Sequence, residues 1–170
     1  LLTGSSGSAD FPTTADAFSR VLRGQTDGFL TRLSREGTQF EFSTLLGGSG
    51  TEYWLMPTPD GHGRIYVVGG TSSRDFPVTP DALQPRFGGG QEDAVLAVFN
   101  ADASQLLYAT YLGGTGDDLI RSLALGPEGE VYLVGSTSSD DFPVTDGVVQ
   151  KQHGGKGDAF VVKLMPVLGQ

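Results

Sequence analysis

The sequence predicts an all-β protein made of a repeated unit, and three observations support this prediction. A nine-residue motif, glycine followed by five residues and then Asp-Phe-Pro, occurs at residues 4–12, 69–77 and 135–143. Each copy is followed by an aspartate that begins a β-like run, namely Asp27, Asp93 and Asp158. Glycine accounts for 26 of the 170 residues, which suits many tight turns between short strands. A fixed period of about 65 residues indicates stacked or radially arranged units, none of which can bury its apolar face alone.

Strand signals follow one another along the whole chain. In residues 40–46, Phe40, Phe42, Thr44 and Leu46 fall on one face of an alternating pattern. Residues 131–134 are apolar on both faces, as expected for a strand enclosed between neighbouring sheets. The other expected strands are short runs bounded by turn residues, at 27–33, 51–56, 64–68, 93–99, 106–112, 119–125 and 158–164. No segment keeps a helical period, so the strands should form sheets without a helical layer.

The most complete unit, residues 51–112, contains four of these strands, and four-stranded units around an axis make a β-propeller. Its first strand carries Pro57 and Pro59, which remove ladder donors, so we expect this strand to be short or bent. A single helical turn is expected after each Asp-Phe-Pro motif, where a threonine precedes a turn, at Thr14, Thr79 and Thr145. That turn would direct three side chains to a common buried site, those of Phe18, Leu83 and Val148.

The repeat divides the chain into about two and a half units of one propeller. Residues 1–50 are expected to hold the outer strands and motif segment of one blade, 51–116 a full blade, and 117–170 most of a further blade. Closure needs at least about four blades, so we expect the propeller to continue outside this chain. The expected partners are other blades of a parent chain, further copies, or another protein that pairs with the open edges.

Composition excludes several classes of partner. The net charge of −9 and the scattered lysines and arginines argue against a nucleic-acid backbone as a partner. No apolar run approaches the roughly 20 residues of a membrane-spanning helix. The chain has no cysteine, so neither disulfides nor thiol chemistry can contribute.

Few residues suggest a chemical site. Asp117 and Asp118 could supply oxygen ligands to Ca²⁺, although aspartates on glycine-rich turns more often accept backbone N–H bonds. His62 and His153 lie among glycines without a catalytic partner motif, and exposed turn positions are expected for both. The aromatic residues best suited to line a sugar-binding surface are Tyr53, Trp54, Tyr66 and Tyr132, with blade packing as the alternative. Tyr53, Trp54 and His62 are the candidate ligand-binding residues.

One family resemblance covers nearly the whole chain. Residues 108–118, Tyr-Ala-Thr-Tyr-Leu-Gly-Gly-Thr-Gly-Asp-Asp, and residues 129–145, which end in Asp-Asp-Phe-Pro-Val-Thr, closely resemble the bacterial SBBP β-propeller repeat. The resemblance implies a blade of large, mostly secreted or cell-surface bacterial proteins, often without known enzymatic activity. By analogy with NHL-type blades, residues 119–125 would form the innermost strand and 106–112 the outermost.

The leading functional hypothesis is a non-catalytic extracellular scaffold or protein-interaction module of a bacterial secreted or cell-surface protein. Two alternatives stay open: a carbohydrate- or ligand-binding propeller with Trp54 near the site, and part of a propeller enzyme whose active residues lie elsewhere. No cofactor is expected, and Ca²⁺ is the one metal considered. The phenylalanines of the motif, Phe76 and Phe142 above all, are expected to be mostly buried and structural.

Overall fold

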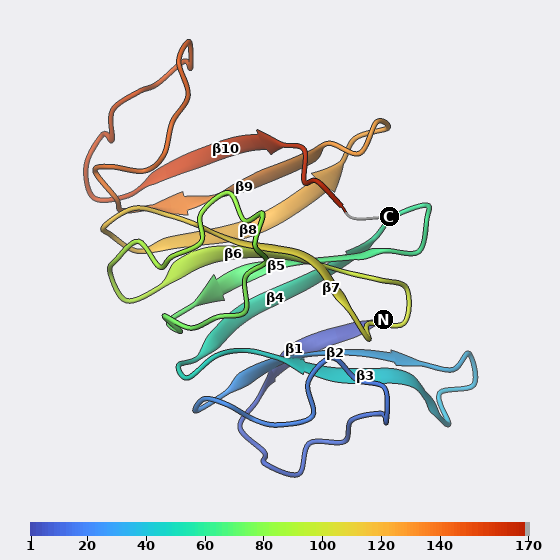
Figure 1. Cartoon of the computed structure of the whole chain (residues 1–170). Helices are drawn as coiled ribbons and strands as arrows, with labels where there is room; N and C mark the ends of the chain where they lie inside the picture. Colours follow the sequence, from blue (N-terminus) through green and yellow to red (C-terminus); the bar gives the residue numbers. More distant parts are fainter. Residues whose placement is uncertain (169–170) are drawn as a thin grey trace.

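The chain folds into three antiparallel sheets, and the all-β prediction is confirmed. A computed structural model describes residues 1–168, apart from the side chains of Trp54 and Leu55, and has no helix over these residues. Its sheets have the orders β1-β2-β3, β4-β5-β6-β7 and β10-β9-β8 (Figure 1). The strands are β1 (Leu2–Ser6), β2 (Asp27–Leu33), β3 (Phe40–Leu46), β4 (Glu52–Pro59), β5 (Ile65–Thr71), β6 (Asp93–Phe99), β7 (Leu106–Leu112), β8 (Asp118–Leu125), β9 (Val131–Thr137) and β10 (Asp158–Leu164).

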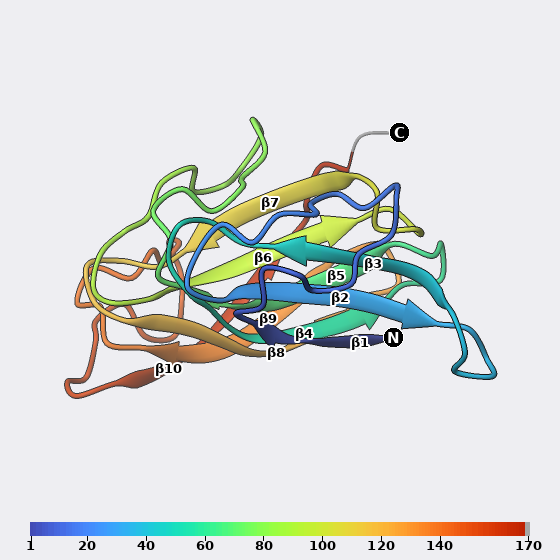
Figure 2. The same cartoon turned by 90° about the horizontal axis from the view of Figure 1, so that it is seen from below.

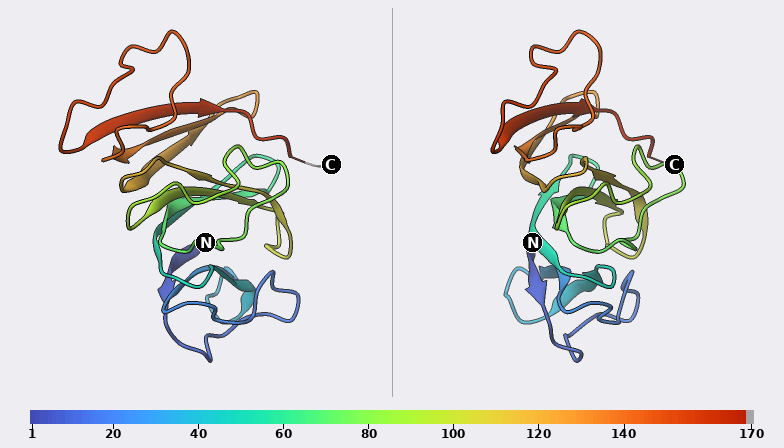
Figure 3. Two further views of the ribbon diagram at one scale, coloured as in Figure 1. Left: turned by 60° about the vertical axis from the view of Figure 1, so that its left-hand side comes forward. Right: turned by 90° about the vertical axis from the view of Figure 1, so that its left-hand side faces the viewer.

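The three sheets follow one another face to face, with the four-stranded sheet in the middle (Figures 1 and 3). Every residue of β5 and β6 is buried. Ile65 and Val67 of β5 belong to the core between the first and second sheets, whereas Tyr66 and Val68 belong to the core between the second and third. Alternate side chains of one strand therefore fill two different cores, which explains why these runs are apolar on both faces.

The three sheets contain the same unit in different states of completeness. The strands β1, β5 and β9 each lead into an Asp-Phe-Pro motif, and β2, β6 and β10 each begin at the aspartate that follows it. The first sheet therefore has the second, third and fourth strands of the unit, and the third sheet has the first, second and third. The propeller-like arrangement of antiparallel sheets predicted from the repeat is present, and the sheets do not close on themselves.

The prolines of β4 predict a strand that is short or bent, and the strand is not short. It has eight residues, as many as β8, its counterpart in the third sheet. The ladder does shift register between Tyr53 and Met56, but β8 shifts in the same way between Ile120 and Ser122 without any proline. The bulge is therefore a property of the repeat. Prolines are tolerated because β4 lies at the edge of its sheet.

The helical turn expected after each motif is a β-turn instead. The Ala82 N–H donates to the Thr79 carbonyl at 3.0 Å, and residues 79–84 then run beside β7 (Figure 2). Phe18 packs edge-on against Phe99 with ring centroids 5.5 Å apart, as expected. Leu83 is 63% exposed, so the prediction of a common buried site for the three side chains is wrong. Pairing of the turn's backbone with the outer strand orients Leu83 outward.

Candidate interaction site

Two of the three residues proposed to bind a ligand, Tyr53 and His62, lie apart in the structure. Tyr53 pairs with Gly70 near the start of β4, whereas His62 is exposed in the turn that joins β4 to β5. These positions are at opposite ends of one hairpin. His62 lines a cavity of about 500 Å³ between this turn and residues 125–129. Trp54 lies in β4, but its side chain is outside the described part of the structure.

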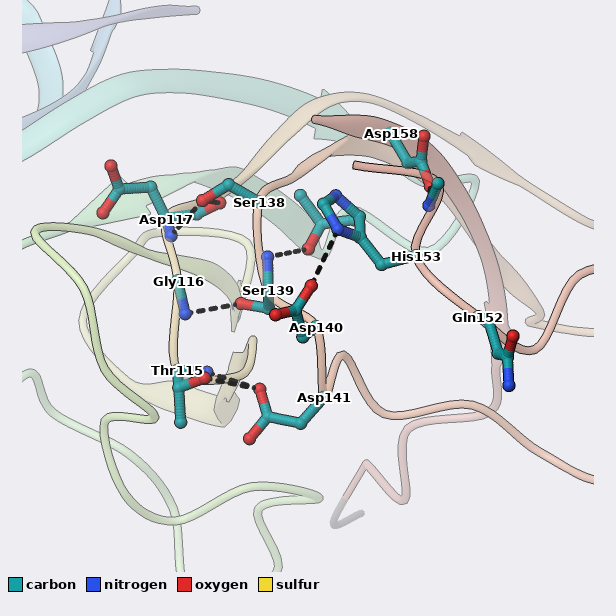
Figure 4. Close-up of polar contacts among 12 residues, drawn as sticks. Thr115, Gly116, Asp117, Ser138, Ser139, Asp140, Asp141, Gln152, His153 and Asp158 are labelled. Carbon is teal, nitrogen blue, oxygen red and sulfur yellow. Dashed lines mark hydrogen bonds and ion pairs between the residues drawn. The ribbon is translucent and has the colours of Figure 1, made fainter. Parts of the chain in front are cut away.

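Asp117 and Asp118 act on separate parts of the junction between the second and third sheets, and Figure 4 shows the part that contains Asp117. The fully buried Asp118 accepts hydrogen bonds from the Gly114 N–H at 2.8 Å and the Ser139 hydroxyl at 2.6 Å, both through Oδ2. On the exposed side of the junction, Asp117 Oδ1 accepts a hydrogen bond from the Gln91 N–H at 2.6 Å. Within the described residues, no three His, Cys, Asp or Glu side chains are grouped so that they could hold a metal ion.

In the second and third motifs a Ser-Ser pair, Ser72-Ser73 or Ser138-Ser139, binds the neighbouring unit. In Figure 4 the Gly116 N–H donates to Ser139 Oγ at 2.8 Å, and the Thr115 N–H donates to Asp141 Oδ1 at 2.7 Å. The junction between the first and second sheets has the same bonds at the same lengths, from Gly50 to Ser73 and from Ser49 to Asp75. Backbone hydrogen bonding from Ser49 holds the pKa of Asp75 below its usual value.

Glycine is required in this junction because the two segments approach closely. A Cβ on Gly48 would lie 2.6 Å from both Ser73 Cβ and Asp75 Oδ1, a separation that real side chains do not adopt. The Gly-Gly pair that ends each fourth strand is therefore a contact surface for the next sheet. This close approach explains why glycine stands at these positions.

Each junction also buries a pair of acidic side chains that sequence reasoning did not detect. Asp27 and Glu52 both lie against Gly47, and Asp93 and Asp118 both lie against Gly113. All four are fully buried. Oxygens of three of these residues have no hydrogen-bond partner among the described residues: Glu52 Oε2, Asp93 Oδ1 and Asp118 Oδ1.

Burial favours the neutral forms of two of these acids, Glu52 and Asp93. It raises the pKa of Glu52 to about 7, and the neighbouring charge of Asp27 acts in the same direction. Burial likewise raises the pKa of Asp93 to about 6, with Asp118 as the neighbouring charge. In the sequence, the recurrence of aspartate is the one feature that points to these buried acid pairs. Their pairing across the sheets depends on the three-dimensional junction, and Glu52 stands where the next unit has Asp118.

His153 is not the exposed turn residue that the sequence predicted. Its side chain is 8% exposed, and its Nδ1 lies 3.1 Å from Asp140 Oδ1. The reason is its position in the repeat, because His153 precedes Gly154 just as Phe87 precedes Gly88 in the second unit. Both glycine N–H groups donate to the aspartate that begins the next strand.

A groove of about 1010 Å³ runs along β10. It is bounded by β10 on one side and by residues 139–153, the connection from β9 to β10, on the other. Figure 1 shows this connection standing away from β10 at the end of the stack. The groove contains apolar side chains of β10 together with exposed polar groups of the connection, among them Thr145 and Gln150.

Comparison with known families supports the repeat. Residues 107–143 match the SBBP family, a beta-propeller repeat. The SBBP match begins in β7, includes β8 and β9, and ends at the proline of the third motif. It therefore contains the Ser-Ser junction described above, and over these residues it confirms the resemblance inferred from the sequence. A search of curated proteins gave no match.

Proposed function

We propose that the chain is a non-catalytic scaffold and protein-interaction module of a bacterial secreted or cell-surface protein. The match to a beta-propeller repeat supports this role, because such units stack on one another to complete their cores. The second sheet contributes side chains to two interfaces, one with the first sheet and one with the third. Further copies of the unit are the partners that such a module fits.

The observation that carries the proposal is the outer face of the third sheet, formed by Tyr132, Val134 and Val161. Their exposed fractions are 37%, 41% and 75%. The counterparts of these side chains in the second sheet are Tyr66, Val68 and Leu96, which the third sheet buries to 1% or less. The outer face therefore repeats three apolar positions of an interface, with Lys163 at the position of the buried Val98.

The free face of a first sheet is the surface that fits this outer face. Leu2 of β1 is 50% exposed, and Phe29 of β2 is stacked on Phe11 outside the core shared with the second sheet. Phe29 occupies the repeat position of Phe160, which packs against the second sheet in the third unit. Contact between the outer face of one copy and the first sheet of another would be head-to-tail.

We expect the wild-type chain to self-associate as its concentration rises, and Val134→Glu to remain monomeric. A carboxylate at position 134 would be desolvated without a partner in a sheet-to-sheet contact. Sedimentation velocity over a range of micromolar concentrations measures this. Val21→Glu is the matched control, since Val21 is 66% exposed and lies in the connection after β1. A wild-type chain that is monomeric at every concentration, or a Val134→Glu chain that associates like wild type, would contradict the proposal.

A further inference from the structure

We propose that the groove along β10 is an acceptor site for one extended polypeptide strand with the sequence pattern of β3 and β7. The inference rests on the proposed function, and it names the chemistry of a partner for that interaction module. It concerns the edge of the third sheet rather than its outer face. The argument comes from the two other sheets, in which the corresponding space is occupied.

In the second sheet the corresponding space is filled by β7. One edge of β7 pairs with β6, and its other edge is bound by residues 79–84 of the preceding connection. The Thr79 N–H donates to the Ala109 carbonyl at 3.1 Å, and the Ala109 N–H donates back to Thr79 Oγ1 at 3.1 Å. Further along, the Tyr111 N–H donates to the Gln84 carbonyl at 3.1 Å. The strand is thus hydrogen-bonded on both sides.

The first sheet holds β3 by the same bonds. The Thr14 N–H donates to the Ser43 carbonyl at 2.9 Å, and the Ser43 N–H donates to Thr14 Oγ1 at 3.2 Å. The Leu45 N–H donates to the Ser19 carbonyl at 3.0 Å. In both sheets that contain a fourth strand, this strand is therefore bound by a threonine three residues after the motif phenylalanine and by the residue five positions beyond that threonine.

In the third sheet these binding groups are present, and the described residues place no strand between them. Thr145 and Gln150 occupy the repeat positions of Thr79 and Gln84, and both line the groove. Thr145 is exposed and has no hydrogen-bond partner among the described residues. The strand β10 pairs only with β9, so one row of its backbone groups is unpaired within the described part of the chain.

The far end of the groove has the residues that would surround a tyrosine or leucine side chain of a bound strand. In the second unit the Tyr111 hydroxyl donates to the Ser73 carbonyl at 2.8 Å and accepts from the Phe76 N–H at 2.9 Å. The rings of Phe76 and Phe87 are each 6.0 Å from the Tyr111 ring. The third unit has Ser139, Phe142 and His153 at these three surrounding positions, and all of them line the groove.

Comparison of β3 with β7 defines the sequence that the groove should take. Residues 42–48 and 108–114 share the pattern aromatic, small, Thr, Leu or Tyr, Leu, Gly, Gly. The small residue is Ser43 or Ala109, each fully buried, so a larger side chain would not fit there. Since Ala109 pairs with Ala97, the small residue of a bound strand should lie opposite Val162. This mode of recognition is the addition of a strand to a sheet edge.

The test uses a fluorescent peptide with the sequence of residues 104–114 and measures its anisotropy as the full chain is added. The chain carries Val134→Glu, which blocks association through the outer face and does not line the groove. We expect saturable binding, and a loss of about tenfold in affinity with Thr145→Val, which removes the hydroxyl but keeps the shape. Thr38→Val, in the exposed turn between β2 and β3, is the matched control and should leave affinity unchanged. A peptide with leucine in place of Ala109 should bind at least tenfold more weakly.

The proposal would be overturned by the absence of saturable binding, by equal binding of a scrambled peptide, or by equal affinity with Thr145→Val. If the peptide fails while the wild-type chain still self-associates through its outer face, the groove assignment is wrong and the proposed function stands. If the peptide binds while the wild-type chain stays monomeric, the groove assignment stands and the proposed self-association through the outer face is wrong. Self-association of the Val134→Glu chain that Thr145→Val abolishes would show that a second copy fills the groove, which contradicts a separate strand as the occupant.

Discussion

Replacing Phe76 with alanine should lower the free energy of unfolding by about 3–5 kcal/mol, the typical cost of removing a fully buried phenylalanine. Phe76 is 3% exposed and belongs to the core between the first and second sheets. Its ring meets that of Tyr111 edge-on, and its N–H donates to the Tyr111 hydroxyl. The prediction from sequence that Phe76 is buried is confirmed. The side chain joins the motif segment, the outer strand and the neighbouring sheet in one contact.

Urea unfolding of the variant measures this change, with an unchanged m-value as the sign that only stability was altered. Phe142→Ala should cost less, because Phe142 is only partly buried and its main ring contact is Phe160 at 4.5 Å. Phe40→Ala is the control, since Phe40 is 46% exposed at the start of β3. A loss below about 1 kcal/mol for Phe76→Ala would contradict the packing described for the motif.

Glu52→Gln should make the chain more stable at pH 8, by on the order of 3 kcal/mol. The pKa of Glu52 is raised from 4.5 to about 7, so the folded chain holds a proton that the unfolded chain releases. The stability from this group is complete below pH 4.5 and is lost as pH rises through 7. Glutamine keeps an oxygen that can accept from Thr71 and Ser73, and it places an amide where Glu52 Oε2 now lies without a partner.

Unfolding free energies measured between pH 4 and pH 8 test this prediction. The wild-type chain should lose stability across the window, and the variant should lose less. Asp93→Asn should have a parallel effect between pH 3.8 and about 6, because burial raises the pKa of Asp93 in the other junction. Glu41→Gln, at an exposed carboxylate of β3, serves as the control. A Glu52→Gln chain that is less stable than wild type at pH 8 would contradict the prediction, because it would show that the junction tolerates an ionised Glu52 beside Asp27.

The strands were predictable because two kinds of regularity agree. The period of the motif located the units, and alternation within runs such as residues 40–46 located the strands. The two prolines of β4 misled the prediction of its length, because sequence alone does not show that a strand lies at a sheet edge. The prediction that the Leu83 side chain is buried is wrong for a similar reason. Its segment pairs with an outer strand, which fixes the direction of its side chain.

The junction and the groove were only partly predictable. Aspartates on glycine-rich turns were correctly interpreted as acceptors of backbone N–H groups, as Asp118 and Asp75 are. The pairing of Asp27 with Glu52 was not detected, because the two residues come from different sheets and only one has the recurring residue type. His153 was judged from its glycine neighbours, although its repeat position is that of Phe87. Alignment of the units by their hydrogen bonds reveals these equivalences.

Amide hydrogen exchange in β6 and β10 tests the central claim most directly, because the two strands are the same element of two units. The described structure gives β6 a neighbour on each side and gives β10 one neighbour, β9. Amides of β6 should exchange only through global unfolding, whereas those of β10 that face the groove should exchange by local opening, orders of magnitude faster. Protection of β10 equal to that of β6 in the isolated chain would contradict an open strand site and the equivalence of the units on which the account rests.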